Sequence, residues 1–276
     1  MNQPRVILLT DIPEWCQPWA AALSNAGFDV QIADDSETVS SSGVLFNRIS
    51  ADAMQHQPAW VAEVESYLEE QEKCGRDIIH GFKVMRLGYD KQAQTEHFRQ
   101  CKVATPDTSA VASVQRAFPD QEVLLKPAIG AYGDGISSLE SGEDIPQSVV
   151  NSTRAILEQV KIKPLDGCVH RAEWIGDRLV YDAATPISDG KTNYCLSNTS
   201  DSTVLKSDLP EQRVAEVTRI MEQAGMHVGS VEYLLLPDGR ASYIDLNPVS
   251  TFHPQTQEQI GMDPYAYFAQ WLSGTV

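Results

Sequence analysis

Blocks of apolar and polar positions over the first 85 residues predict strands and helices in turn. Apolar or alternating runs of strand length occur at residues 6–10, 28–32 and 44–46. Between the first two runs, apolar residues from Trp15 to Ala26 recur at helical spacing until a glycine ends them. Such alternation favours a parallel sheet with covering helices, which is a Rossmann-like unit. No G-x-G-x-x-G pattern follows the first run, which weighs against a dinucleotide site there.

The pattern changes in the last part of this unit and after it. A long polar helix is predicted over residues 58–74, the spacing turns helical again near Lys91, and Pro106 then fixes an extended segment. We therefore place a domain boundary near residue 85, which gives one domain over residues 1–85 and a second over 86–276.

The pattern of the second domain predicts mainly strands and hairpins. A strand at residues 123–126 precedes a glycine-rich loop, and a helix is predicted from Ile145 to Glu158. Two hairpins follow, at residues 169–183 and 231–246, and a terminal helix spans 264–272. The predicted fold class is α/β, with α+β character in the C-terminal part.

Charge and cysteine content limit the partners and the compartment. The chain has 21 basic and 38 acidic residues, a net charge of −17, which opposes binding to a polyanionic backbone. No apolar run approaches the roughly 20 residues of a membrane helix. The five cysteines are widely spaced without a C-x-x-C pair, so we expect reduced thiols in a cytoplasmic protein. We expect neither a nucleic acid nor a membrane partner.

A lysine at the end of a predicted strand is followed by a glycine-rich loop. Lys126 precedes Gly130, Gly133 and Gly135 in the segment KPAIGAYGDGI. Glycines let backbone N–H groups approach phosphate oxygens, and the lysine adds a point charge. The alternative is an ordinary hairpin loop, because the segment lacks the GKS or GKT of a P-loop. A phosphate site therefore needs a second signal.

The second signal is a group of two acidic residues and one asparagine near the end of the chain. Glu232 lies on one strand of the second hairpin, and Asp245 and Asn247 share one face of the other strand. Two carboxylates and an amide oxygen that converge form a hard oxygen site suited to magnesium. The alternative is a solvated acidic edge. We favour the metal site because Asp245 stands between two apolar residues.

Lys126 with its glycine loop, followed by the Glu232 and Asp245-Leu246-Asn247 pattern, resembles the ATP-grasp superfamily in order and spacing. The resemblance covers about residues 80–276, and the preceding unit is similar to the domain that usually comes before the grasp. It implies a Rossmann-like pre-ATP-grasp domain and then a two-lobed ATP-grasp domain. The small lobe would cover about residues 86–160 and the large lobe about 161–276.

The resemblance also implies the cofactors and their contacts. ATP phosphates would contact Lys91 and Lys126 under the loop of Gly130, Gly133 and Gly135, and Mg²⁺, or Mn²⁺ in its place, would bind Glu232, Asp245 and Asn247. Residues 156–162 resemble the strand whose backbone holds adenine. The resemblance thus implies that Gln159, Val160 and Ile162 contact the adenine. Family members commonly have Gln-Glu at the position of Gln159-Val160, and an alternative register uses Glu173-Trp174-Ile175.

Two further polar residues are candidates for the reacting groups. Arg171 on the first hairpin and Asn193 in a polar loop could contact a carboxylate, an acyl phosphate or a nucleotide phosphate. A surface salt bridge and a turn asparagine are equally good interpretations. Residues 46–50 resemble the substrate-side loop of the preceding domain, with Arg48 as a weaker candidate. Ser250 could reach substrate or could be a simple turn serine.

The reaction that the resemblance implies is carboxylate activation by ATP, followed by attack of an amine on the acyl phosphate. The expected partners are a small-molecule carboxylate and an amine, on an amino acid or a peptide, and the glutamate-ligase branch is the most similar. Two alternatives remain open, a small-molecule kinase with the same fold and a nucleotide-binding regulatory protein without turnover. We also leave a homodimer open.

Overall fold

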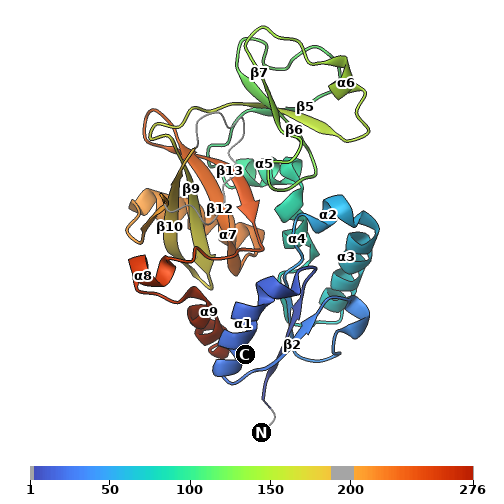
Figure 1. Ribbon diagram of the computed structural model, residues 1–276, viewed down its shortest axis with the longest axis vertical. Coiled ribbons are helices and arrows are strands. Elements are labelled where there is room, and N and C mark those ends of the chain that lie inside the picture. The colour runs from blue at the N-terminus through green and yellow to red at the C-terminus, as the bar shows by residue number, and fades with distance from the viewer. Residues whose placement is uncertain (1–2, 188–201, 276) are drawn as a thin grey trace.

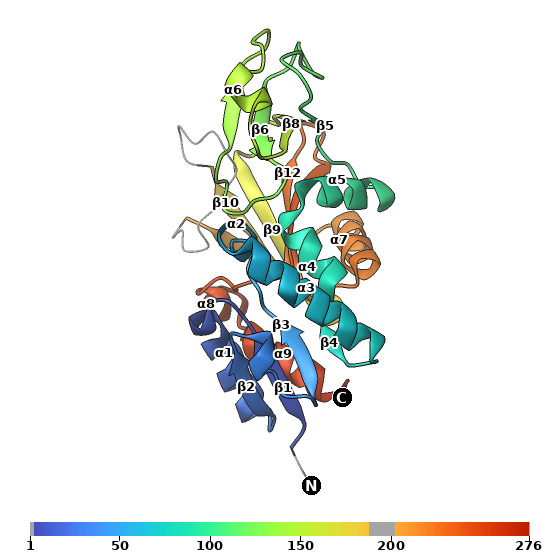
Figure 2. The same cartoon turned by 90° about the vertical axis from the view of Figure 1, so that its right-hand side faces the viewer.

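Three β-sheets follow one another along the long axis of the molecule (Figure 1). The computed structural model describes residues 3–187 and 202–275. No helix among these residues is long and apolar enough to cross a membrane. Figure 2 shows the same three sheets from the side. The helices over residues 82–100 pack beside the large sheet in the middle of the molecule.

The first sheet, here called the N-terminal sheet, is four-stranded and wholly parallel, in the order β2-β1-β3-β4. Its strands are β1 (Arg5–Leu9), β2 (Asp29–Ala33), β3 (Val44–Asn47) and β4 (Ile78–Ile79). The helices of this part are α1 (Pro13–Asn25), the 3-10 helix η1 (Ser36–Thr38), α2 (Ala53–His56) and α3 (Pro58–Lys73). The predicted parallel α/β unit is confirmed.

The alternation of β1 explains how this sheet is covered. Val6 and Leu8 pack into the cluster that contains Trp19 of α1, whereas Ile7 and Leu9 pack into the cluster that contains Val61 of α3. Successive strand residues point to opposite faces, so a continuous apolar run requires a helix on each side.

The C-terminal end of the chain returns to this first sheet. Helix α9 (Pro264–Ser273) lies beside α1 in both views (Figures 1 and 2). Trp19 of α1 makes edge contacts with Phe46 at 5.1 Å and with Phe268 at 5.0 Å between ring centroids. The same buried cluster includes Ile175 of the large sheet in the middle of the molecule. The first 85 residues therefore share their core with the rest of the chain.

A second, small sheet is antiparallel, in the order β5-β8-β6-β7. Two helices lead to it, α4 (Phe82–Tyr89) and α5 (Lys91–Gln100). Its elements are β5 (Thr108–Ala110), β6 (Val123–Pro127), β7 (Ser137–Leu139), α6 (Gln147–Val150) and β8 (Ile156–Val160).

The helix predicted from Ile145 to Glu158 is wrong. Only Gln147–Val150 is helical, and the chain becomes strand β8 at Ile156. Strand β8 pairs with β6 along its whole length, from Ile156 opposite Pro127 to Val160 opposite Val123. This pairing satisfies the backbone groups of a segment rich in β-branched residues, and it overrides the weak helical spacing.

The third, large sheet is antiparallel, in the order β11-β10-β9-β12-β13. Its elements are β9 (Cys168–Ile175), β10 (Arg178–Pro186), β11 (Val204–Lys206), α7 (Glu211–Ala224), β12 (Val228–Leu235), β13 (Ala241–Asn247) and α8 (Thr256–Ile260). Both predicted hairpins are confirmed. Helix α7 packs with Phe98 of α5 against one face of the large sheet. The small sheet lies beyond one end of the large sheet, along the long axis of the molecule (Figure 2).

Candidate active site

One cleft of about 400 Å³ lies where the N-terminal sheet, the small sheet and the large sheet meet. Each part of the chain contributes walls. They include Trp15, Ile49, Ser50 and Ala51 from the N-terminal part, Lys91 from α5, Lys126, Gly130, Gly133 and Gln159 from the small-sheet part, and Arg171, Glu232, Ile244, Asp245 and Asn247 from the large sheet.

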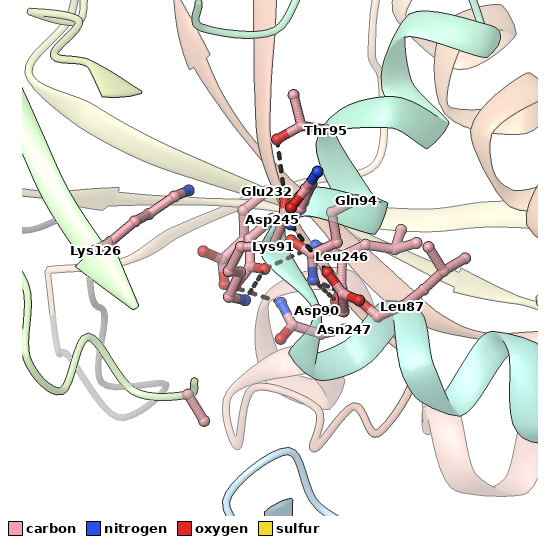
Figure 3. A network of polar contacts seen from close by, with 12 residues as sticks. Leu87, Asp90, Lys91, Gln94, Thr95, Lys126, Glu232, Asp245, Leu246 and Asn247 are labelled. Atoms are coloured by element: carbon pink, nitrogen blue, oxygen red, sulfur yellow. Dashed lines mark hydrogen bonds and ion pairs between the residues drawn. The ribbon is translucent and has the colours of Figure 1, made fainter. Parts of the chain in front are cut away.

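Lys126 reaches into this cleft from strand β6. Its side chain points toward the acidic residues of the large sheet (Figure 3), and only 7% of the residue is exposed. Lys126 Nζ donates a hydrogen bond to Gln159 Oε1 on the adjacent strand at 3.0 Å. Burial, together with the positive charge of Lys91, lowers the pKa of Lys126 to about 8.

Lys91 is placed by the start of helix α5. The Asp90 side chain caps this helix by accepting from the backbone N–H groups of Gln92 and Ala93. The Lys91 N–H donates to Ala128 O at 2.8 Å, which joins the helix start to the end of β6. Lys91 Nζ lies 2.5 Å from Asp245 Oδ1 (Figure 3). The two lysines therefore face the same acidic group.

The glycine-rich loop connects β6 to β7. Gly133 and Gly135 have φ angles of +73° and +71°, which strain other residues. Gly130 and Gly133 line the cleft, whereas Gly135 does not. A Cβ on Gly135 would lie 3.1 Å from Pro127 Cγ, so the third glycine permits close packing at the base of the loop.

The acidic residues are brought together by a β-bulge. Glu232 pairs directly with Asp245, whereas its neighbour Tyr233 pairs with Tyr243, so Ile244 is the extra residue. Tyr243 and Leu246 consequently pack into the core under α7, while Ile244 and Asp245 both line the cleft. Asn247 Nδ2 lies 3.4 Å from Glu232 Oε1. The predicted trio therefore meets at one edge of the cleft.

The two carboxylates of this trio, Glu232 and Asp245, would be stabilised by a cation. Burial and the like charge of Asp245 raise the pKa of Glu232 to about 7. A divalent cation would relieve this repulsion, and a half-turn of the Asn247 amide would present Oδ1 to it. No group of three or more His, Cys, Asp or Glu side chains arranged for a metal occurs in the described part of the chain. The present set has only two carboxylates and depends on the amide.

Arg171 of β9 is held by three partners. It donates through Nε to Glu173 Oε1 at 2.7 Å, through Nη1 to Glu232 Oε1 at 3.2 Å and through Nη2 to Ser250 Oγ at 2.8 Å. Ser250 Oγ in turn donates to Glu173 Oε2 at 2.5 Å. The neighbouring carboxylates of Glu173 and Glu232 raise the pKa of Arg171 against the opposing effect of burial. The guanidinium is therefore fixed and charged.

This network includes residues whose roles the sequence does not reveal. Ser250 is fully buried and supports Arg171, and Glu173 is 1% exposed. Arg48 is also buried, with Nη2 donating to the Ser250 carbonyl oxygen and its guanidinium 4.6 Å from the Trp19 ring centroid. It does not line the cleft, although its neighbours Ile49 and Ser50 do.

The remaining predicted contacts lie elsewhere. Val160 ends strand β8 and Ile162 packs with Val169, and neither lines the cleft. Asn193 lies outside the described residues.

The three-sheet architecture with this cleft is the ATP-grasp fold, as comparison with solved structures shows. No protein-family model matches the chain, and no curated protein matches its sequence. The ATP-grasp ligase PsnB, in complex with a phosphomimetic variant of a minimal precursor, Mg and ADP, aligns with a TM-score of 0.69 at 14% identity over 99% of both chains. The D-cycloserine synthetase DcsG aligns with a TM-score of 0.71 at 16% identity, over 98% of this chain and 99% of the other. A RimK domain protein ATP-grasp from Sphaerobacter thermophilus DSM 20745 aligns with a TM-score of 0.69 at 18% identity, over 97% and 98%.

Proposed function

We propose that this chain is an ATP- and Mg²⁺-dependent ligase that joins a carboxylate to an amine. The observation that carries the proposal is the meeting of cations and carboxylates in one cleft. Lys126 reaches in from the small sheet, and Lys91 of α5 lies beside Glu232 and Asp245 of the large sheet (Figure 3). Nucleotide triphosphates bring both the negative charge that lysines bind and the metal that carboxylates bind.

The similar structures support this proposal. PsnB binds Mg and ADP together with a precursor, and DcsG is a synthetase of the small molecule D-cycloserine. For the present chain we therefore propose an amino acid or a peptide as the source of the carboxylate or the amine.

Each part of the cleft has a role in the proposed reaction. Lys91, Lys126 and the N–H groups of the glycine loop bind the phosphates, and the β8 segment around Gln159, which lines the cleft, holds the adenine. The metal would be held by Glu232, Asp245 and Asn247, where it would neutralise phosphate charge. Mn²⁺ has similar oxygen preferences and is expected to substitute.

The proposed chemistry has two steps. The carboxylate oxygen attacks the γ-phosphorus of ATP, which releases ADP and forms an acyl phosphate. The amine then attacks the acyl carbon, phosphate leaves, and the nitrogen loses a proton. Arg171 binds the developing negative charge, because a guanidinium has five N–H groups and only three are used by its partners among the described residues.

A screen of acid and amine pairs tests the proposal. ADP release is followed in a coupled assay, and products are identified by mass spectrometry, with Asp245→Ala as the inactive control. The proposal requires ADP, phosphate and an amide from one acid and amine pair. A stable phosphorylated product that never becomes an amide would instead identify a kinase. Equal activity of the Asp245→Ala variant would contradict the metal assignment.

A further inference from the structure

The glycine-rich loop is held by a residue of the N-terminal part. Gln55 lies on the short helix α2 of the N-terminal part. In the one orientation that satisfies both ends of its amide, Oε1 accepts from the Ala131 N–H at 2.7 Å and Nε2 donates to Asp134 Oδ2 at 3.2 Å. Ala131 and Asp134 both line the cleft. The side chain therefore spans from α2 to both arms of the loop.

Other contacts show that this loop is attached from two directions. On the small-sheet side, Arg154 Nη2 donates to Ile129 O at 3.3 Å, and Arg154 Nη1 lies 3.7 Å from Asp134 Oδ2. On the N-terminal side, Ile129 packs against the buried cluster that includes Ala53 of α2. Both side chains of the Arg154–Asp134 pair are largely exposed, so this ion pair contributes little to holding the loop in place. Gln55 provides the hydrogen bonds from α2 to the loop, in addition to the backbone hydrogen bond that Gly130 N–H donates to Tyr89 O at 3.2 Å.

We propose that Gln55 is a positioning residue that holds the glycine-rich loop against helix α2 of the N-terminal part. Its amide binds a loop backbone N–H and a loop carboxylate at once, so it fixes the position of the loop and not only its distance from α2. The inference rests on the proposed function, because a loop in this position would cover the nucleotide phosphates and exclude water from the acyl phosphate.

The first test needs no activity. Hydrogen exchange of the Ala131 amide is measured in the ligand-free protein, for the wild type, Gln55→Ala and the control Gln57→Ala. Gln57 is exposed and follows the same helix. Loss of the Gln55 hydrogen bonds is expected to speed Ala131 exchange by about five- to tenfold, and the control is expected to match the wild type. Equal exchange in the wild type and Gln55→Ala would overturn the proposal.

A charge-swapped pair makes the test specific. Gln55→Glu keeps an acceptor for the Ala131 N–H but repels Asp134 and loses the donated hydrogen bond. Adding Asp134→Asn restores a donor to the introduced carboxylate. The double variant is therefore expected to exchange more slowly at Ala131 than Gln55→Glu alone. The same rate in both variants would contradict a direct contact between positions 55 and 134.

The second test measures whether the position of the loop affects ATP binding and the coupling of ADP release to amide formation. Gln55→Ala is expected to raise the KM for ATP about fivefold and to release more than one ADP per amide formed, because water reaches the acyl phosphate. Faster Ala131 exchange without either kinetic change would overturn the positioning role. If the wild type consumes no ATP with any acid and amine pair, the proposed ligase function fails. The exchange result then decides the Gln55 contact independently.

Discussion

Lys91 Nζ and Asp245 Oδ1 are 2.5 Å apart, so a cation at the start of α5 is paired with a carboxylate at the end of β13. Our proposal assigns the first residue to phosphate and the second to Mg²⁺. Binding of a magnesium nucleotide would therefore separate this ion pair and give each partner a new opposite charge. In the free protein, the pair keeps both side chains in place for that exchange.

Replacing the carboxylate of Asp245 with an amide tests the acidic half of the site. Asp245→Asn removes one charge from the trio with almost no change of shape, and we expect ADP release to fall by about 100-fold or more. The matched control is Asp238→Asn in the exposed turn of the same hairpin, where Asp238 pairs only with Arg240 among the described residues. A comparable loss in both variants would indicate a general effect on the hairpin.

The lowered pKa of Lys126 predicts how nucleotide binding depends on pH. Burial lowers its pKa to about 8, so the side chain is charged below pH 8 and loses its proton above it. The KM for ATP is therefore expected to rise about tenfold between pH 7 and pH 9. Lys126→Arg keeps its charge over this range, and its KM is expected to stay nearly flat. An identical rise in both proteins would show that another group controls it.

The strands and hairpins that carry the site could be predicted from the sequence because their signals are local. The apolar run of β1 and the alternation around Asp245 each depend on a few neighbouring residues. The bulge at Ile244 was not predicted, because pairing with β12 determines it. Helix α7 was also not predicted, although Val217, Ile220 and Met221 recur at helical spacing and Gly225 ends the helix. The boundary near residue 85 stays a prediction, since the core around Trp19 joins both ends of the chain.

The polar support of the site could not be predicted for a similar reason. Arg171 and Ser250 are separated by 79 residues, and Gln55 and Ala131 by 76. No spacing rule connects such positions. Single-residue interpretations therefore left Ser250 undecided between a substrate contact and a turn, whereas the structure shows that it hydrogen-bonds Arg171 and Glu173.

Two buried serines form a matched pair for testing the support of Arg171. Ser250→Ala leaves Arg171 Nη2 and Glu173 Oε2 without this partner, so we expect kcat to fall about tenfold with little change in the KM for ATP. Ser230 is equally buried on β12, and its hydroxyl has no hydrogen-bond partner among the described residues. Ser230→Ala is therefore expected to be neutral. Equal kinetic losses in both would argue against a specific role of Ser250.

His80 predicts the acid sensitivity of the fold. Its ring is 2% exposed, and Nε2 accepts from the backbone N–H groups of His227 and Val228 at 3.1 and 3.2 Å. Burial, with the charges of His227 and Arg48, lowers the pKa of His80 to about 3. The unfolded chain binds a proton near pH 6.5 and the folded one does not, so stability is full above pH 6.5 and falls as the pH decreases toward 3.

Unfolding in urea at several pH values measures this effect. Between pH 7 and pH 5, the wild type is expected to lose about 2 kcal/mol more unfolding free energy than His80→Gln, whose side-chain oxygen can still accept the two hydrogen bonds. Parallel losses in the two proteins would show that His80 is not the titrating group.

The most direct measurement of the proposed reaction follows the oxygen atoms of the carboxylate. The acid identified in the screen is labelled with ¹⁸O in its carboxyl group, and the phosphate released during amide formation is analysed by mass spectrometry. An acyl phosphate places one carboxylate oxygen on the phosphorus, so we expect one ¹⁸O atom in the phosphate for each amide formed. Amide formation with unlabelled phosphate, or ADP release that never depends on a carboxylate, would contradict the account.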